Sequence, residues 1–333
     1  MITTATHDTK RGEDARTRLI ALSEMPDAWA RAWDLWRATA GPHLATIDDE
    51  PAPDANDQWM FFQAILGAWP LELLEQDDAA GIEDFRERLI AYGEKAMREG
   101  KRRSSWVNVD EAYEGAVKRL FEAIVAPGSD FLRELRPFAQ RLAHLGMLTS
   151  LGRTVLKATL PGLPDTYQGT EFWDFSFVDP DNRRPVDYPA LARALEEERP
   201  ASELLGTWWD GRVKQAVLAK LLAERAERAG FYADADYRAL PAEGAKAAHV
   251  LAFQRADGAG GGDDLVVAVP RLVAKLVPDG QVWSGEGFAG TVLDLGAGTR
   301  WRDLVTGETR AGGQADCAEL FRHLPFAVLR RTE

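Results

Sequence analysis

A histidine and an aspartate stand side by side near the start of the chain, at His7 and Asp8. They follow a short stretch, residues 1–5, that reads as the end of a β-strand. A carboxylate at the carboxyl end of a barrel strand could hold sugar hydroxyls and stabilise the positive charge that develops when a glycosidic bond breaks. An isolated His-Asp pair is more often a capped surface loop, so the pair needs support from elsewhere in the chain.

A second unusual segment, residues 160–171, contains Gly162, Pro164, Tyr167, Gly169 and Glu171. Prolines there would fix the end of a strand, and a glycine would permit a sharp turn after it. The alternative is a proline-rich turn without a role in binding.

The run that follows, residues 172–187, combines aromatic residues with carboxylates, an amide and guanidinium groups. Asp179, Asn182 and Arg183 are its candidate ligand contacts, because such groups can bind several hydroxyls at once. The alternative is a surface loop held by ion pairs.

Together these segments resemble the last two strand ends of an alpha-amylase-type (β/α)8 barrel. The string from Thr6 to Arg18 and the run from Glu171 to Asp187 are similar to the maltooligosyl trehalose synthase family in particular. Weaker agreement, such as Ser105-Trp106 ahead of Tyr113-Glu114, extends the resemblance over nearly the whole chain.

The resemblance implies that Asp8 is the third catalytic carboxylate, which stabilises the transition state, and that His7 binds the same glucose ring. The substrate-binding residues that it implies are His7, Lys10, Arg11, Tyr167, Asp179, Asn182 and Arg183. It implies no metal and no cofactor. The substrate would be a maltooligosaccharide, whose reducing-end α-1,4 bond is converted to α-1,1 in trehalose biosynthesis.

In this superfamily the nucleophile and the acid/base carboxylate precede the His-Asp segment, and only seven residues precede Asp8. We therefore expect the C-terminal portion of such an enzyme, inactive alone, with the missing N-terminal part of the barrel as its partner. Two alternatives remain at this point: a fragment of an alpha-amylase-type glycoside hydrolase, and a non-catalytic glucan-binding or assembly piece.

The expected fold is α/β: the C-terminal part of a (β/α)8 barrel with a large helical insertion, followed by a small antiparallel β-sandwich domain. The expected parts are 1–20 (end of barrel strand seven and start of the following helix), 21–145 (helical insertion subdomain), 146–240 (strand eight and C-terminal barrel helices) and 241–333 (antiparallel β domain).

Local patterns give finer expectations. Residues 13–39 have helical periodicity, and Trp29, Trp33 and Trp36 would form a packing seam on one side of that helix. Asn108 and Glu111 would form a capping pair at the start of another helix. The glycine-rich loop 257–262 joins two predicted strands, so it is not a phosphate-binding loop.

Composition narrows the class of protein. The net charge of -13 argues against nucleic acid as a partner, because such a surface repels phosphates. No apolar stretch reaches the roughly 18 residues of a membrane helix, and the start lacks the apolar region of a signal peptide. The single cysteine, Cys317, excludes an internal disulfide, reads as a core residue and fits a reducing cytoplasm.

Overall fold

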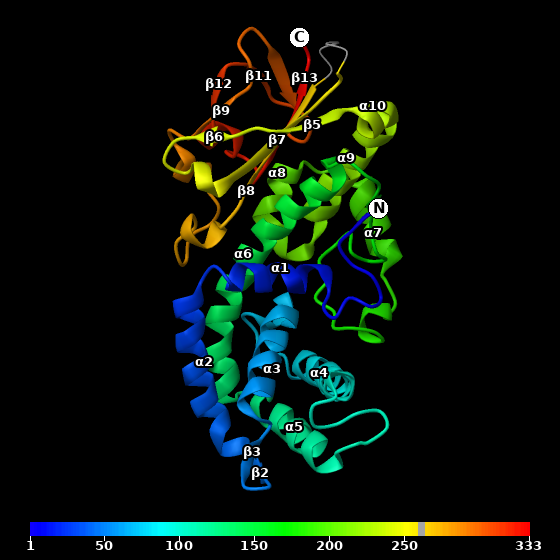
Figure 1. Cartoon of the computed structure of the whole chain (residues 1–333), viewed down its shortest axis with the longest axis vertical. Coiled ribbons are helices and arrows are strands. Elements are labelled where there is room, and N and C mark those ends of the chain that lie inside the picture. The colour runs from blue at the N-terminus through cyan, green and yellow to red at the C-terminus, as the bar shows by residue number, and fades with distance from the viewer. Residues whose placement is uncertain (259–263) are drawn as a thin grey trace. The chain divides into compact units, whose positions relative to one another are not determined.

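The computed structural model describes residues 1–258 and 264–333. They form two compact units, each built from several stretches of chain (Figure 1). The helical unit contains His7–Gly146 and Asp174–Arg184. The sheet unit contains Met1–Thr6, Met147–Trp173 and Pro185–Glu333. The segments around the predicted site are therefore divided between the units.

The helical unit consists of helices with one short hairpin. Its elements are α1 (Glu13–Leu22), α2 (Pro26–Ala40), η1 (Gly41–His43), β2 (Ala45–Ile47), β3 (Glu50–Ala52), α3 (Ala55–Ala68), η2 (Leu71–Leu73), α4 (Ala79–Gly100), α5 (Glu111–Ile124), the part of α6 (Asp130–Thr159) up to Gly146, and η3 (Asp181–Arg183). Strands β2 and β3 pair antiparallel, with Thr46 opposite Pro51.

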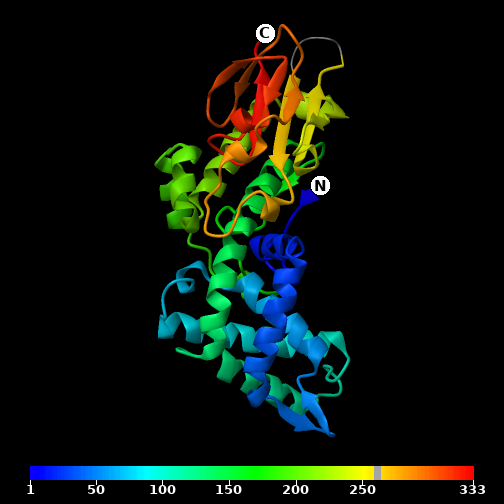
Figure 2. The ribbon, with the colours of Figure 1, turned by 90° about the vertical axis from the view of Figure 1, so that its left-hand side faces the viewer.

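Helix α2 lies beside the first half of α6 (Figure 1 and Figure 2). Aromatic side chains fill the core of the helical unit between them. The ring of Trp36 contacts Phe131 and Phe138 of α6, with centroids 5.7 Å away in both cases. Trp29 packs edge-on against Trp36, and Trp33 packs against Trp59 of α3. The predicted tryptophan seam is confirmed as a helix-packing surface.

Two local predictions in this unit were wrong in detail. The helical stretch 13–39 is two helices, because Pro26 begins α2 at its first turn. A proline lacks the N–H that a continuous helix needs, and its fixed φ suits a helix start. Helix α5 is capped by Asp110, whose Oδ1 accepts a 3.0 Å hydrogen bond from Tyr113 N, and not by Asn108. Asp110 directly precedes the helix, so its side chain reaches the free N–H groups.

The sheet unit combines helices with antiparallel strands. Its helical elements are α6 from Met147 on, α7 (Tyr188–Glu196), α8 (Ala201–Leu204), η4 (Leu205–Asp210), α9 (Arg212–Glu227), α10 (Ala229–Asp234), η5 (Ala247–His249), η6 (Val273–Lys275), η7 (Gly285–Phe288) and α11 (Cys317–Leu320). Its strands are β1 (Ile2–Thr3), β4 (Pro164–Asp165), β5 (Asp236–Ala239), β6 (Ala242–Glu243), β7 (Val250–Ala256), β8 (Asp264–Pro270), β9 (Val292–Asp294), β10 (Arg300–Asp303), β11 (Thr309–Ala311), β12 (Gln314–Asp316) and β13 (Ala327–Arg331).

The strands beyond residue 235 form two antiparallel sheets, as the alternating sequence predicted. One has the order β11-β10-β13-β8-β7-β5 and the other β12-β9-β6. Side chains from both sheets, among them Val266, Leu293 and Trp301, belong to one buried hydrophobic cluster. Cys317 is buried in the same cluster, so its predicted role as a core residue is confirmed. The predicted glycine-rich loop lies largely outside the described residues.

Strands β1 and β4, far apart in sequence, are neighbours in the sheet unit. They pair in parallel, with Ile2 opposite Pro164 and Thr3 opposite Asp165. The hydroxyl of Thr3 also donates to Asp165 Oδ2 at 3.1 Å. Within the described ranges this is the only parallel pair. The His-Asp segment and the downstream proline-rich segment thus follow two adjacent strands that run in the same direction.

Candidate functional site

His7 and Asp8 lie at the start of the helical unit, on the loop that leads into α1. Their side chains are 51% and 79% exposed, and His7 Nε2 lies 3.2 Å from Asp8 Oδ2. An exposed carboxylate next to an imidazole can both accept hydrogen bonds from a ligand and donate one to it. The pair is therefore accessible to a hydroxyl-bearing ligand.

A second loop meets this one. The side-chain amide of Asn182, in the turn η3, donates a 2.9 Å hydrogen bond to the backbone oxygen of His7. Arg11 pairs with Phe177 of the same second segment as an isolated antiparallel bridge. The loops at 7–11 and 177–183 are thus in direct contact, although they are far apart in sequence.

Asp181 fixes the second loop to α4. Its carboxylate accepts two hydrogen bonds from Arg88, at 2.7 and 3.0 Å, and one from Phe177 N at 2.7 Å. Burial raises the pKa of Asp181, but the hydrogen bond and charge of Arg88 outweigh it, so the pKa lies below its ordinary value. The carboxylate is therefore ionised at neutral pH and serves as an anchor.

Asp179 forms the second attachment of this loop to α4, and its side chain remains partly exposed to solvent. Lys95 of α4 donates to its backbone oxygen at 2.8 Å and to its Oδ1 at 2.5 Å, and Arg183 lies 3.4 Å from its Oδ2. The hydrogen bond from Lys95 lowers the pKa of Asp179, with further contributions from the charges of Lys95, Arg183 and His7.

Lys10 links the first loop to the same helix. Its Nζ lies 2.7 Å from Glu99 Oε2, at the end of α4. The hydrogen bond to Glu99 raises the pKa of Lys10, and the negative charges of Asp8 and Asp179 add to the effect. The same bond lowers the pKa of Glu99. Lys10 therefore stays protonated within a cluster of carboxylates.

The face of α4 that holds both loops was missed by sequence reasoning. It consists of Arg88, Tyr92, Lys95 and Glu99, whose spacing of four, three and four residues places them on one side of a helix. Tyr92 stacks on Phe177 with ring centroids 4.6 Å apart. This spacing of charged residues around a tyrosine could have indicated a polar face on the helix. It does not predict which loops contact that face.

The start of α1 fixes the other end of the first loop. Gly12 N donates to Ser176 O at 2.7 Å, and Glu13 N donates to Asp174 Oδ2 at 3.0 Å. A carboxylate at a helix N-terminus satisfies free N–H groups and favours the helix dipole. Asp14 Oδ2 accepts a 2.7 Å hydrogen bond from Asp174 N, so these acidic residues have a structural role.

The structure therefore brings together most of the predicted site residues. Those within the helical unit are His7, Asp8, Lys10, Arg11, Asp179, Asn182 and Arg183, which we call the two-loop cluster. Tyr167 belongs to the sheet unit, in the turn after β4. Its backbone oxygen accepts hydrogen bonds from Thr170 N at 3.0 Å and Oγ1 at 2.7 Å, and Gly169 has the positive φ of 79° that this turn requires.

The two-loop cluster presents a carboxylate, an imidazole, an ammonium and a guanidinium group. A carbohydrate needs both donors and acceptors, because each hydroxyl can act as either. Among the described residues no group of three or more His, Cys, Asp and Glu side chains could hold a metal ion. The cluster is chemically suited to a polyhydroxyl ligand.

Solved structures are similar to this chain over nearly its whole length. The maltooligosyltrehalose synthase of Arthrobacter ramosus matches 100% of this chain with a TM-score of 0.79 and 34% identity, over 38% of its own length. A synthase from Sulfolobus tokodaii matches 98% of the chain with a TM-score of 0.72 and 27% identity, over 38% of its length. No family model matches.

Curated proteins are also similar to this chain. Proteins assigned as maltooligosyl trehalose synthases in two strains of Mycobacterium tuberculosis are 36% identical over 332 residues, which is 99% of this chain. The chain spans 37% of the length of these relatives. Over its whole length it is homologous to the C-terminal portion of maltooligosyl trehalose synthases. In the described ranges, no helix has the length and apolar character needed to cross a membrane.

Proposed function

We propose that this chain is part of a maltooligosyl trehalose synthase and that Asp8 is its transition-state-stabilising carboxylate. The observation that carries the proposal is the hydrogen bond between Asn182 and His7, because it joins the two segments whose sequences resemble that family. In the reaction the reducing-end α-1,4 bond of a maltooligosaccharide is broken, and the released glucose is rejoined through an α-1,1 bond.

In this proposal Asp8 holds hydroxyls of the glucose ring and stabilises the oxocarbenium-like charge, and His7 binds the same ring. Lys10, Arg11, Tyr167, Asp179, Asn182 and Arg183 bind the substrate. The position of Lys10 supports these roles, because Glu99 holds its ammonium group at 2.7 Å on the loop that also carries Asp8.

A retaining mechanism needs two further carboxylates, a nucleophile and an acid/base, about 5–5.5 Å apart. We place them in the part of the relatives that this chain does not span. In the same proposal β1 and β4 are the last two strands of a (β/α)8 barrel, the helical unit is an insertion into it, and the C-terminal sheets form a β-sandwich domain. The enzyme would act in the cytoplasm, on sugar alone and without a cofactor.

The test is a chimera in which this chain replaces the matching segment of the Mycobacterium tuberculosis relative. We expect maltopentaose to lose reducing ends without release of free glucose. Asp8→Asn should lower turnover by about 10²–10³-fold, the usual effect of removing one electrostatic stabiliser. Asp27→Asn, an exposed aspartate of the same unit, is the control and should have no effect.

Release of glucose or maltose as the main product would instead identify a hydrolase. Normal turnover in a folded Asp8→Asn chimera would contradict the role of Asp8. Binding of maltooligosaccharides without any turnover in the chimera would support a glucan-binding piece in place of an enzyme.

A further inference from the structure

The loop between α4 and α5, residues 101–110, presents a large aromatic side chain to solvent. Trp106 is 58% exposed, and its neighbour Val107 is 98% exposed. A single exposed aromatic residue is common on protein surfaces. What distinguishes Trp106 is the number of interactions that hold its ring and its loop in one position.

The guanidinium group of Arg98 lies over the indole ring of Trp106. Arg98, in the last turn of α4, lies 5.0 Å from the centroid of Trp106. Its Nε and one NH2 donate to the two oxygens of Glu114 at 2.9 and 2.8 Å, and Glu94 lies 2.7 Å away. Since two carboxylates hold the guanidinium through three contacts, the ring over which it lies is held as well.

Hydrogen bonds within the loop define its turn. Ser105 N donates to Asn108 O at 2.9 Å, and Asn108 N donates to Ser105 Oγ at 3.0 Å. These bonds close the chain around Trp106. The hydroxyl of Ser104 donates to Glu114 and accepts from Asp110 N at 3.1 Å. The two sides of the turn that carries Trp106 are thus tied to the same glutamate that holds Arg98.

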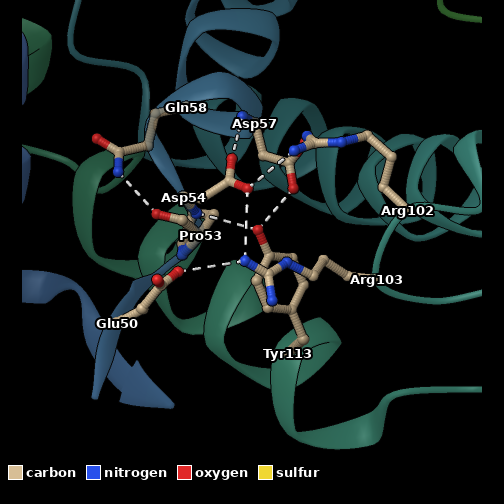
Figure 3. A network of polar contacts seen from close by, with 8 residues as sticks. All are labelled: Glu50, Pro53, Asp54, Asp57, Gln58, Arg102, Arg103 and Tyr113. Carbon is tan, nitrogen blue, oxygen red and sulfur yellow. Dashed lines mark hydrogen bonds and ion pairs between the residues drawn. The ribbon is translucent and has the colours of Figure 1, made fainter. Parts of the chain in front are cut away.

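The base of the loop is held by a second network (Figure 3). Arg102 donates to Asp57 Oδ1 at 3.1 Å and to Asp54 Oδ2 at 3.2 Å. Arg103 reaches Glu50 of the hairpin at 3.5 Å. Figure 3 shows the hydroxyl of Tyr113 between these groups, where it donates to Asp57 Oδ2 at 2.6 Å and accepts from Asp54 N at 3.0 Å.

We propose that Trp106 is a stacking platform for a glucose unit of the maltooligosaccharide, away from the reacting end. This inference rests on the proposed function. An indole face offers flat apolar area, which suits the C–H face of a pyranose, and a fixed ring loses little entropy when it binds. The free face of a ring that is supported on the other side by Arg98 meets both needs.

The position of Trp106 supports this occupant. Glu99 bonds Lys10 of the two-loop cluster, and the preceding residue of α4, Arg98, supports Trp106. Arg98 and Glu99 are consecutive residues in the last turn of α4, with Cα atoms about 3.8 Å apart, so the platform and the cluster are both attached to the end of this helix, on sides about 100° apart. An oligosaccharide held at Asp8 by its reducing end can therefore extend over the end of α4 towards Trp106.

The experiment measures maltoheptaose and maltotriose affinity of the full chain by titration calorimetry. Trp106→Ala should raise the Kd for maltoheptaose about tenfold, with a smaller change for maltotriose, because only the longer sugar reaches the platform. Trp106→Phe should retain most of the affinity. Trp209→Ala is the matched control, because Trp209 is 56% exposed and belongs to the sheet unit. This variant should bind both sugars with unchanged affinity.

Equal maltoheptaose affinity in Trp106→Ala and the unsubstituted chain would overturn the platform. The proposed function would still stand after a negative result for Trp106→Ala if Asp8→Asn weakens sugar binding in the same assay. Equal losses for both sugars would also overturn the platform, because they would indicate a general structural defect. Failure of the unsubstituted chain to bind either sugar would overturn the platform and leave the proposed function to be decided by the chimera.

Discussion

The side-chain amide of Asn182 lies 2.9 Å from the backbone oxygen of His7, across a sequence separation of 175 positions. This bond connects the turn η3 to the loop that carries Asp8. The contact is exposed, so it adds little to global stability. It constrains instead the direction in which the His7 and Asp8 side chains leave the loop.

Asn182→Ala should therefore change the site more than the fold. We expect the free energy of unfolding to fall by less than about 1 kcal/mol, while amide hydrogens at residues 7–9 exchange faster. Hydrogen-exchange mass spectrometry with urea unfolding would measure both. Asn56→Ala, at an exposed position of α3, is the control and should leave exchange at residues 7–9 unchanged. Unchanged exchange in Asn182→Ala would show that the bond does not hold the loop.

Asp181 should contribute much more to stability than a typical surface carboxylate. Its side chain and that of Arg88 are only 10% and 14% exposed, and they form a two-pronged pair. Asp181→Asn should destabilise the protein by about 2 kcal/mol, the scale of charged hydrogen bonds. Asp84 is 65% exposed, and its Oδ2 lies 3.7 Å from Nη1 of Arg88. Asp84→Asn should therefore lower the free energy of unfolding by less than about 0.5 kcal/mol. Equal effects of the two substitutions in urea unfolding would contradict this ranking.

The contribution of Asp181 should also depend on pH in a defined direction. Its folded pKa lies below the ordinary value of 3.8, chiefly because Arg88 outweighs the effect of burial. Such a group stabilises the folded state above its unfolded pKa, and the contribution is lost as pH falls through the folded pKa. The difference in unfolding free energy between the unsubstituted protein and Asp181→Asn should therefore be constant near neutral pH and shrink below about pH 3.8. A difference that grows as the pH falls would have the wrong sign.

Short motifs in the sequence predicted which residues would lie near one another. His7, Asp8, Asp179, Asn182 and Arg183 were assigned to one site from resemblance, and the structure gathers them in the helical unit. The strand stub and the proline-rich segment were assigned to neighbouring strand ends, and β1 and β4 pair in parallel. Motifs of this kind can be read because each is local in the chain.

The supporting contacts could not be read in the same way. Helix α4 shows a charged face at Arg88, Lys95 and Glu99, but periodicity does not tell which distant loop pairs with it. The break before Pro26 was hidden by apolar spacing that continues through it. In both cases a local pattern was correct, and the information that was missing came from contacts between distant segments.

Gly12 is required because Asp174 occupies the space that a side chain would fill. A Cβ at Gly12 would lie 2.6 Å from Asp174 O and 2.7 Å from its Oδ2, the groups that cap α1. Gly12→Ala should therefore cost about 1–3 kcal/mol, the range for overpacking. At Gly41 a Cβ would meet nothing within 4 Å, so Gly41→Ala should be neutral or slightly stabilising. Thermal unfolding of the two variants provides the comparison, and an equal shift in Tm would remove the proposed role of the cap.

Tyr113 should connect the stability of the helical unit to the position of Trp106. Its buried hydroxyl bonds both Asp57 Oδ2 and Asp54 N, and burial, with the hydrogen bond to Asp57, raises the pKa of this phenol well above its ordinary value. Tyr113→Phe leaves the ring in place but removes both bonds, so we expect a loss of about 1–3 kcal/mol in urea unfolding.

Because Arg102 binds the same two aspartates, Tyr113→Phe should also loosen the base of the loop at residues 101–110. Maltoheptaose affinity should then fall while maltotriose affinity is kept, as in Trp106→Ala but to a smaller extent. Tyr188→Phe, at an exposed position, is the control for loss of a phenol and should change neither quantity. A destabilised Tyr113→Phe protein with full maltoheptaose affinity would contradict this link. Sugar binding at Trp106 would then not depend on the rigidity of the loop.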